Sequence, residues 1–204
     1  MLDRDHPLLL ASGSPRRRDI LAALRIPFVA RPVDVDERPR PGEGASPCLE
    51  RVVQAKLGAA VSVARGLAVG GVLVADTVVV LDAEALGKPT DEADARRMLA
   101  RLAGREHVVL TRFALGLPGT EACPAAAQTV ATRVVFRALS AAEIARYAAS
   151  GEGLDKAGAY AIQGLGSFLV RSIAGSYTNV VGLPSAELCE ALVATGLVPC
   201  FPLA

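Results

Sequence analysis

The spacing of apolar residues changes repeatedly along the chain, which predicts a mixture of strands and helices. Short apolar runs bounded by Gly or Pro predict strands, and apolar residues three and four positions apart predict helices. The predicted strands and extended segments span residues 8–12, 28–36, 72–81, 107–116, 127–137, 157–163 and 167–173. The predicted helices span residues 15–24, 48–65, 91–103, 140–149 and 184–195. This order predicts an α/β fold around a mixed sheet.

Two strand pairs and three helix starts can be placed more closely. Residues 107–116 and 127–137 should be antiparallel neighbours across the loop 117–126, and residues 157–163 should pair with 167–173. Helices should begin at Ser14 and Ser46, each followed by Pro, and at Ser140, whose capping box is completed by Glu143. These segments contain no internal repeat, and residues 1–204 are expected to form a single domain.

An acidic residue interrupts the most apolar predicted strand. Asp76, followed by Thr77, lies in the run VLVADTVVVL at residues 72–81, which is typical of a strand buried on both faces. Burying an ionised carboxylate there costs several kcal/mol or raises its pKa unless a cation, metal or donor cluster meets it. Asp76 is therefore either a structural ion-pair partner or part of a functional site.

The first predicted helix begins with three arginines, Arg16, Arg17 and Arg18, at the positive end of its own dipole. Each such charge is unfavourable by about 0.3–1 kcal/mol. Hydroxyl groups, free backbone N–H groups and guanidinium groups at a strand-to-helix turn suit a polyphosphate, and Ser12 lies in the same turn. The alternative is that the arginines, Arg18 above all, extend into solvent.

Three lysines are further candidates for an anion site. Lys56 falls on the apolar stripe of its predicted helix, where it either extends to the surface or reaches a negative group in the interior. Lys88 is held on a turn between Gly87 and Pro89, aimed at a ligand or solvated. Lys156 lies in a loop beside Asp155.

Composition excludes several classes of function. The net charge is +1 and only 4% of residues are aromatic, with no Trp, so a nucleic-acid partner is not expected. No apolar stretch is long enough for a membrane helix or a signal peptide, so we expect a cytoplasmic protein without a membrane partner. The four cysteines are expected to be free thiols, and two histidines cannot form a histidine metal cluster. His107 is interpreted as structural.

Several blocks in the chain together resemble the Maf-like nucleoside triphosphate pyrophosphatases across about residues 7–195. These blocks are ASGSPRR (11–17), ADT (75–77), GKP (87–89), KAGAYAIQG (156–164) and GSYTNVVGLP (175–184). The resemblance implies an elongated α/β fold akin to the inosine triphosphate pyrophosphatases, with two lobes around a cleft, a divalent cation and frequent homodimers. It also implies hydrolysis of a nucleoside triphosphate to the monophosphate and pyrophosphate.

The resemblance also implies roles for individual residues. Asp76 matches the proton acceptor, and Arg16, Thr77 and Gln163 match the residues tied to base preference. Further matching cleft positions are Ser12, Arg17, Glu37, Lys56, Lys88 and Lys156. The block around Gln163 looks like the branch that acts on dTTP and UTP, not the branch acting on 7-methyl-GTP. The turn at residues 82–84 departs from the family, which often has a glycine there.

Physical chemistry supports such a reaction. Clustered cations and a bridging metal would neutralise charge on the leaving pyrophosphate, and a carboxylate would deprotonate water. Asp76 and Glu37 are the expected metal ligands, and their oxygen donors favour Mg²⁺ or Mn²⁺. The alternatives are a non-catalytic nucleotide-binding regulator of septum formation, and a phosphomonoesterase or sugar-nucleotide enzyme that uses the same anion site.

Overall fold

The computed structural model describes residues 1–119 and 123–203, and its centre is one mixed sheet. In these residues the sheet has seven strands in the order β2-β1-β3-β5-β6-β7, and β4 pairs with β3 beside this path. The strands are β1 (Leu8–Leu10), β2 (Phe28–Ala30), β3 (Gly71–Leu81), β4 (Glu84–Leu86), β5 (Glu106–Gly116), β6 (Ala126–Phe136) and β7 (Val170–Ala174). Strand β1 is parallel to β2 and β3, and the remaining pairs are antiparallel. The α/β prediction is confirmed.

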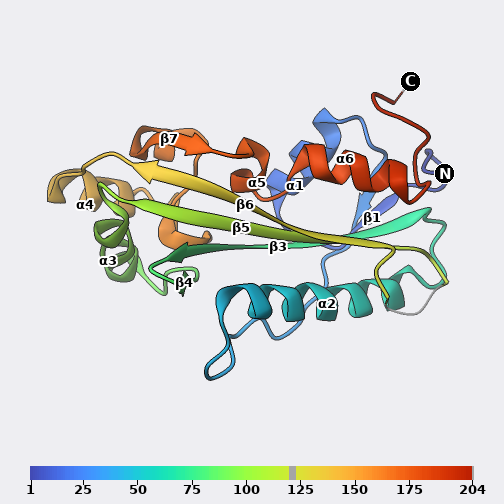
Figure 1. Ribbon diagram of the computed structural model, residues 1–204, viewed down its shortest axis with the longest axis horizontal. Coiled ribbons are helices and arrows are strands. Elements are labelled where there is room, and N and C mark those ends of the chain that lie inside the picture. The colour runs from blue at the N-terminus through green and yellow to red at the C-terminus, as the bar shows by residue number, and fades with distance from the viewer. Residues whose placement is uncertain (120–122, 204) are drawn as a thin grey trace.

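Helices cover both faces of this sheet. They are α1 (Pro15–Ala23), α2 (Ala45–Ala64), α3 (Glu92–Leu102), α4 (Ala141–Ala149), α5 (Tyr177–Val181) and α6 (Ser185–Ala194), with 3₁₀ turns η1 (Ala157–Ala159) and η2 (Gly164–Leu169). Helix α2 lies along one face, and α1 and α6 lie on the other, at the end that holds both termini (Figure 1). None of the helices in the described ranges is long and apolar enough to cross a membrane.

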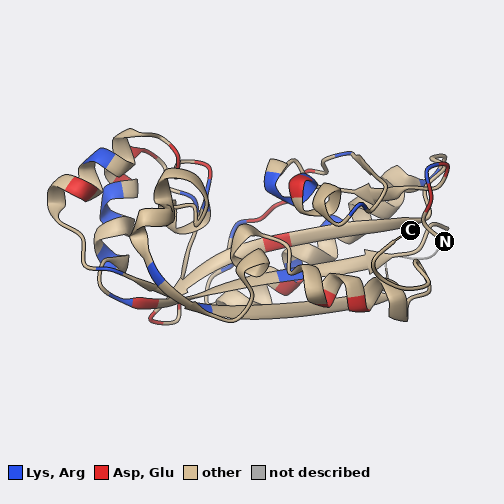
Figure 2. Ribbon diagram, turned by 90° about the horizontal axis from the view of Figure 1, so that it is seen from above, with Lys and Arg blue, Asp and Glu red and all other residues tan. Residues whose placement is uncertain are grey.

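The long strands β3, β5 and β6 connect two lobes at opposite ends of the molecule (Figures 1 and 2). The first lobe contains β1, β2, α1, α2 and α6, and the second contains β4, α3, α4, η1, η2 and β7. At the first lobe, alternate residues of β3 enter two cores, because Leu73 and Ala75 face α6 while Val72 and Val74 face α2. Val79 and Leu81 enter the core of the second lobe. Strand β3 therefore leaves one lobe and enters the other between Ala75 and Val79.

The segment after Asp155 is the main error of the sequence prediction. The expected strand pair 157–163 and 167–173 is wrong, because residues 157–159 and 164–169 form 3₁₀ turns and only β7 is a strand, paired with β6. Gly158 and Gly164 have φ values of +70° and +66°, which a regular strand cannot accommodate. The apolar residues of this segment therefore indicate that it is buried, and they do not indicate that it pairs as a strand.

Smaller differences concern element ends. Strand β2 stops at Ala30, and the short strand β4 and helix α5 were not expected. Helix α2 begins at Ala45 with Gly44 as its N-cap, not at Ser46, and Ser14 makes no side-chain cap bond, whereas the capping box of Ser140 is confirmed. The expected loop at 117–126 includes residues 120–122, which lie outside the described residues.

The turn that departs from the family is a two-residue hairpin turn. Asp82 and Ala83 between β3 and β4 have φ values of +52° and +67°. This left-handed conformation is the one that favours glycine in such turns. The Asp82 carboxylate accepts hydrogen bonds from the Arg105 guanidinium at 2.6 and 2.8 Å.

His107 is a structural residue of the second lobe, as expected. Its side chain is 2% exposed, its Nε2 lies 2.8 Å from Tyr160 Oη, and its ring packs edge-on against Phe136 and Tyr160. Its Nδ1 has no hydrogen-bond partner among the described residues. Burial lowers the pKa of His107 to about 4.

This pKa predicts a loss of stability in mild acid. Between the unfolded pKa near 6.5 and the folded pKa near 4, only the unfolded chain binds the proton, so the free energy of unfolding falls as the pH decreases. The loss from His107 should reach about 2 kcal/mol at pH 5. Urea unfolding at pH 7 and pH 5 should therefore show a smaller pH effect in His107→Gln. The control His6→Gln, which removes an exposed histidine, should keep the original dependence, and an equal dependence in all three proteins would contradict this assignment.

Candidate active site

A cleft of about 1260 Å³ lies between the two lobes. All the candidate residues predicted from the sequence line it, so the structure brings together side chains from distant parts of the chain. They are Ser12, Arg16, Arg17, Glu37, Lys56, Asp76, Thr77, Lys88, Lys156 and Gln163. The expected arrangement of two lobes around a cleft is confirmed.

The cleft is built on a gap in the pairing of strand β3. Strand β1 pairs with β3 only as far as Leu73, and β4 pairs with it only from Val79. Between these positions β3 pairs with β5 on one side and presents its other edge to the cleft. The carbonyl oxygens of Leu73 and Ala75 both point to this edge, where they accept from Ala11 N and Arg17 Nη1. By the same alternation, the backbone groups of Thr77 point to this edge.

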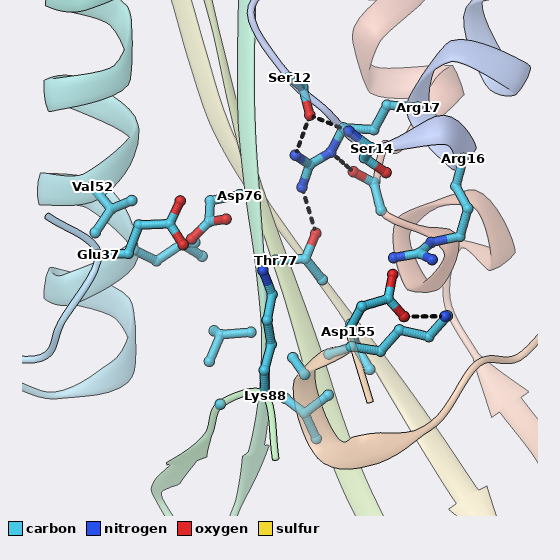
Figure 3. Close-up of a pocket in the computed structure, with 18 of the residues that line it drawn as sticks. Ser12, Ser14, Arg16, Arg17, Glu37, Val52, Asp76, Thr77, Lys88 and Asp155 are labelled. Atoms are coloured by element: carbon cyan, nitrogen blue, oxygen red, sulfur yellow. Dashed lines mark hydrogen bonds and ion pairs between the residues drawn. The ribbon is translucent and has the colours of Figure 1, made fainter. Parts of the chain in front are cut away.

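Strand alternation places the two polar side chains of β3 on opposite faces. Asp76 faces α2 and Thr77 faces α1, as Figure 3 shows. The Asp76 side chain is 25% exposed, so the expectation of a strand buried on both faces is wrong at this position. Asp76 is partly exposed because β3 passes between the lobes at this position, where the core of neither lobe covers it.

Lys56 meets Asp76 and Glu37 together. Its Nζ lies 3.1 Å from Asp76 Oδ1 and 2.6 Å from Glu37 Oε1, and the lysine is 7% exposed. Lys56 therefore reaches a negative group from the apolar stripe of α2 and does not extend to the surface. Burial would raise the pKa of Glu37, but the hydrogen bond and charge of Lys56, with the charge of Lys88, hold that pKa below its usual value.

The two carboxylates around Lys56 suit a hard divalent cation. The described residues contain no group of three or more His, Cys, Asp or Glu side chains that could hold a metal ion. Mg²⁺ is commonly bound by one or two carboxylates, with water and substrate phosphates as the other ligands. The donor set of Asp76 and Glu37 therefore fits Mg²⁺ or Mn²⁺ when phosphate oxygens complete it.

Arg17 is buried and its guanidinium group is largely occupied by the protein. Its Nε donates to Gly182 O at 2.8 Å, and its Nη1 donates to Ser12 Oγ at 3.0 Å and to Ala75 O at 2.9 Å. Its Nη2 donates to Thr77 Oγ1 at 3.2 Å. Since a guanidinium group has five N–H donors, one is left for a ligand. Arg18, by contrast, is exposed, as the alternative interpretation expected.

The hydroxyl of Thr77 has a fixed direction. Thr111 Oγ1 must donate to Asn179 O at 2.9 Å, so it accepts from Thr77 Oγ1, also at 2.9 Å. Thr77 Oγ1 already accepts from Arg17. Its proton therefore points away from the cleft, and it can offer a ligand only a lone pair. The sequence interpretation missed Thr111 and Asn179, both fully buried; Asn179 lies in one of the blocks that carry the family resemblance.

Cations approach the cleft from both lobes. Arg16 of the first lobe and Asp155 of the second face each other, and Lys88 points towards Asp76 and Thr77 (Figure 3). Lys156 Nζ donates to Asp155 Oδ1 and to Glu152 O. Burial would raise the pKa of Asp155, but Lys156 and Arg16 hold it below its usual value. The cleft therefore places cations from both lobes around Asp76, the carboxylate on the wall formed by β3.

Comparisons with known proteins agree with the resemblance seen in the sequence. Three proteins named dTTP/UTP pyrophosphatase are similar over most of the chain. The one from Myxococcus xanthus (strain DK1622) is 50% identical and covers 93% of each chain. The one from Syntrophomonas wolfei is 46% identical and covers 92% of this chain and 96% of the relative. The one from Nitratidesulfovibrio vulgaris is 47% identical, with 96% and 90% covered.

Comparison with solved structures and with family models completes the assignment. A HAM1 protein from Coxiella burnetii aligns with a TM-score of 0.43 and 14% identity, over 64% of this chain and 73% of that chain. This partial likeness carries no argument about function. The family model described as Maf-like protein matches residues 7–195. The chain therefore belongs to the Maf-like protein family.

Proposed function

We propose that this protein hydrolyses nucleoside triphosphates, dTTP and UTP above others, to the monophosphate and pyrophosphate. The observation that carries the proposal is the pairing of Asp76 with Lys56 on the wall of a cleft lined by cations of both lobes. The names of the similar proteins support the same substrates. We also propose that residues 1–204 act as one domain, because one sheet runs through both lobes.

Asp76 is the residue placed to accept a proton from water. The Lys56 ammonium group lies 3.1 Å from its carboxylate, and the open edge of β3 leaves room for water and substrate beside it. The water oxygen forms a bond to the α-phosphorus while the bond to the bridging oxygen of pyrophosphate breaks. The water proton passes to Asp76, and the electron pair of the broken bond leaves with pyrophosphate.

Arg16, Lys88 and Lys156 are placed to bind the phosphates and to stabilise charge on the leaving group. Asp76 and Glu37 would hold Mg²⁺ or Mn²⁺, which would supply positive charge at the phosphate oxygens. Because Lys56 contacts both carboxylates, its ammonium group fixes their positions before substrate binds. Arg17 supports the wall of the cleft by joining Ser12, Ala75 and Gly182.

Base choice would depend on Gln163, whose side chain is exposed in the cleft. The 4-oxo group of uracil or thymine can accept a hydrogen bond from the NH₂ of Gln163. The N3–H of the same base can donate to the Gln163 carbonyl. Thr77 offers a lone pair only, so it also suits a donor on the substrate. Cytosine presents a bare N3 and an amino group, which reverses the pattern and leaves partners unpaired.

This model predicts that kcat/KM for dTTP and UTP exceeds that for CTP by at least about tenfold. Gln163→Glu should reduce this ratio, because a carboxylate only accepts hydrogen bonds. The measurement is a panel of nucleotides assayed for pyrophosphate with Mg²⁺ and with Mn²⁺. Equal hydrolysis of CTP and dTTP by the unmodified protein would disprove the amide interaction, and release of orthophosphate alone would favour a phosphomonoesterase.

The same panel separates an enzyme of the cytoplasmic nucleotide pool from a nucleotide-binding regulator. A regulator of septum formation would bind nucleotides in the cleft without turnover. Its binding site would not need a carboxylate at Asp76 beside the cations, and this position is the feature that favours an enzyme. A homodimer is a further expectation, which the sedimentation of the purified chain would test.

A further inference from the structure

The segment that carries Gln163 depends on hydrogen bonds from outside it. Gln163 lies between the 3₁₀ turns η1 and η2, where no helix or sheet ladder holds the backbone. Backbone N–H groups in such a segment need partners from side chains or water. A residue that recognises a base must be held to within about 0.5 Å, so these partners affect recognition.

Two side chains of the second lobe bind backbone N–H groups on both sides of Gln163. Tyr147 Oη accepts from Ala161 N at 3.1 Å, two residues before Gln163. Glu152 Oε1 accepts from Leu165 N at 2.8 Å, and its Oε2 accepts from Gly166 N at 2.7 Å. Gln163 is therefore held from both directions along the chain.

These two contacts form one network. Tyr147, at 2% exposure on α4, donates its Oη proton to Glu152 Oε2 at 2.9 Å. Since that proton is committed to the carboxylate, the Tyr147 oxygen is available to accept from Ala161 N. A carboxylate acceptor makes each of its bonds stronger than a neutral acceptor would. Tyr147 on α4 and Glu152, which follows the end of this helix, thus set the position of the segment together.

Two glycines allow the segment to approach this network. A Cβ atom on Gly164 would lie 2.4 Å from Glu152 Oε1, and one on Gly166 would lie 2.6 Å from Tyr147 Oη. A Cβ atom on Gly166 would also lie 2.3 Å from the backbone oxygen of Ala161, so a larger residue there would displace either the segment or its partners. Both glycines therefore leave room for the close approach of the segment to Glu152 and Tyr147.

We propose that Glu152 and Tyr147 are positioning residues that orient the Gln163 amide towards the pyrimidine base. Neither is among the described residues that line the cleft, so they act on the substrate only through the segment they hold. The proposal rests on the proposed function and adds to it a structural origin for pyrimidine selectivity. It predicts that the two residues affect the choice between UTP and CTP more than the rate of hydrolysis of UTP.

The test uses Glu152→Gln and Tyr147→Phe, which preserve size while removing acceptors. The matched control is Glu143→Gln, which makes the same chemical change in the capping box of α4, where the carboxylate accepts from Ser140 and Arg137. Glu152→Gln should reduce the ratio of kcat/KM for UTP over CTP about tenfold and leave kcat for UTP within about threefold. Hydrogen exchange at Ala161, Leu165 and Gly166 should become faster, whereas the control should change neither quantity.

A double variant decides whether the effect passes through Gln163. In a Gln163→Ala background, Glu152→Gln should leave the UTP to CTP ratio unchanged, because the residue it positions is gone. A full additional effect in that background, or equal losses for UTP and CTP in the single variant, would overturn the proposal. If the unmodified protein hydrolyses no nucleotide, the proposed function fails, and the same ratios are then measured as dissociation constants. Equal affinity of the unmodified protein for UTP and CTP would overturn the positioning role.

Discussion

Replacing Asp76 by asparagine should reduce kcat about 10³-fold while the protein stays folded. A positioned general base contributes about 10²–10⁴-fold to a rate, and the amide cannot accept the water proton. Stability should change by less than about 1 kcal/mol, because Lys56 retains its 2.6 Å contact with Glu37. Steady-state pyrophosphate release and urea unfolding of the same preparation give the two quantities.

The control for this experiment is Glu50→Gln. Glu50 pairs with Arg112 at 2.8 Å, and it is not among the described residues that line the cleft. This variant should keep full activity and stability. If Asp76 were only a structural partner of Lys56, Asp76→Asn would lose several kcal/mol of stability and retain most of its kcat. That pattern would exclude a catalytic role.

Arg17→Ala should lower the free energy of unfolding by about 3 kcal/mol. The substitution removes the donors for two buried carbonyl groups, Ala75 O and Gly182 O, and for the hydroxyl of Ser12. Arg17→Lys should recover only part of the loss, because an ammonium group cannot match a planar guanidinium group with partners in several directions. Chemical denaturation measures both changes.

The neighbouring residue supplies the comparison for Arg17. Arg18→Ala removes the same charge from the same helix at an exposed position, so stability should change by less than about 0.5 kcal/mol. If Arg17→Ala kept full stability and lost only affinity for the triphosphate, this prediction would be wrong. Arg17 would then be chiefly a phosphate ligand, which is the role expected from the sequence.

The sequence was sufficient to predict residues that are conspicuous in their local context. Asp76 interrupts an apolar strand, and Lys56 interrupts an apolar stripe, so each could be identified without knowing its partner. Their direct contact could not be predicted, because it depends on how α2 packs across β3. The hydrogen bonds that occupy the Arg17 guanidinium group could not be predicted either, because the acceptor residue Gly182 is 165 positions away along the chain.

The prediction of the fold succeeded where the apolar pattern and the secondary structure agree. It failed where apolar residues are buried without forming a strand or a long helix. The long strands β3, β5 and β6 carry enough β-branched residues to be recognised. Residues 157–169 are also apolar, but positive φ values at Gly158, Ala159 and Gly164 turn them into compact 3₁₀ turns. A family resemblance identified this segment as important and could not supply its conformation.

The gap in the pairing of β3 has a consequence for the tendency of the protein to aggregate. Unpaired strand edges invite pairing with another chain and so promote aggregation. Here the exposed stretch is bounded by β1 at Leu73 and by β4 at Val79, so an incoming strand would find too few positions to pair. The gap also contains Asp76, and Arg17 already occupies the carbonyl of Ala75. An opening wide enough to admit a small ligand is thus too short and too charged to start a fibril.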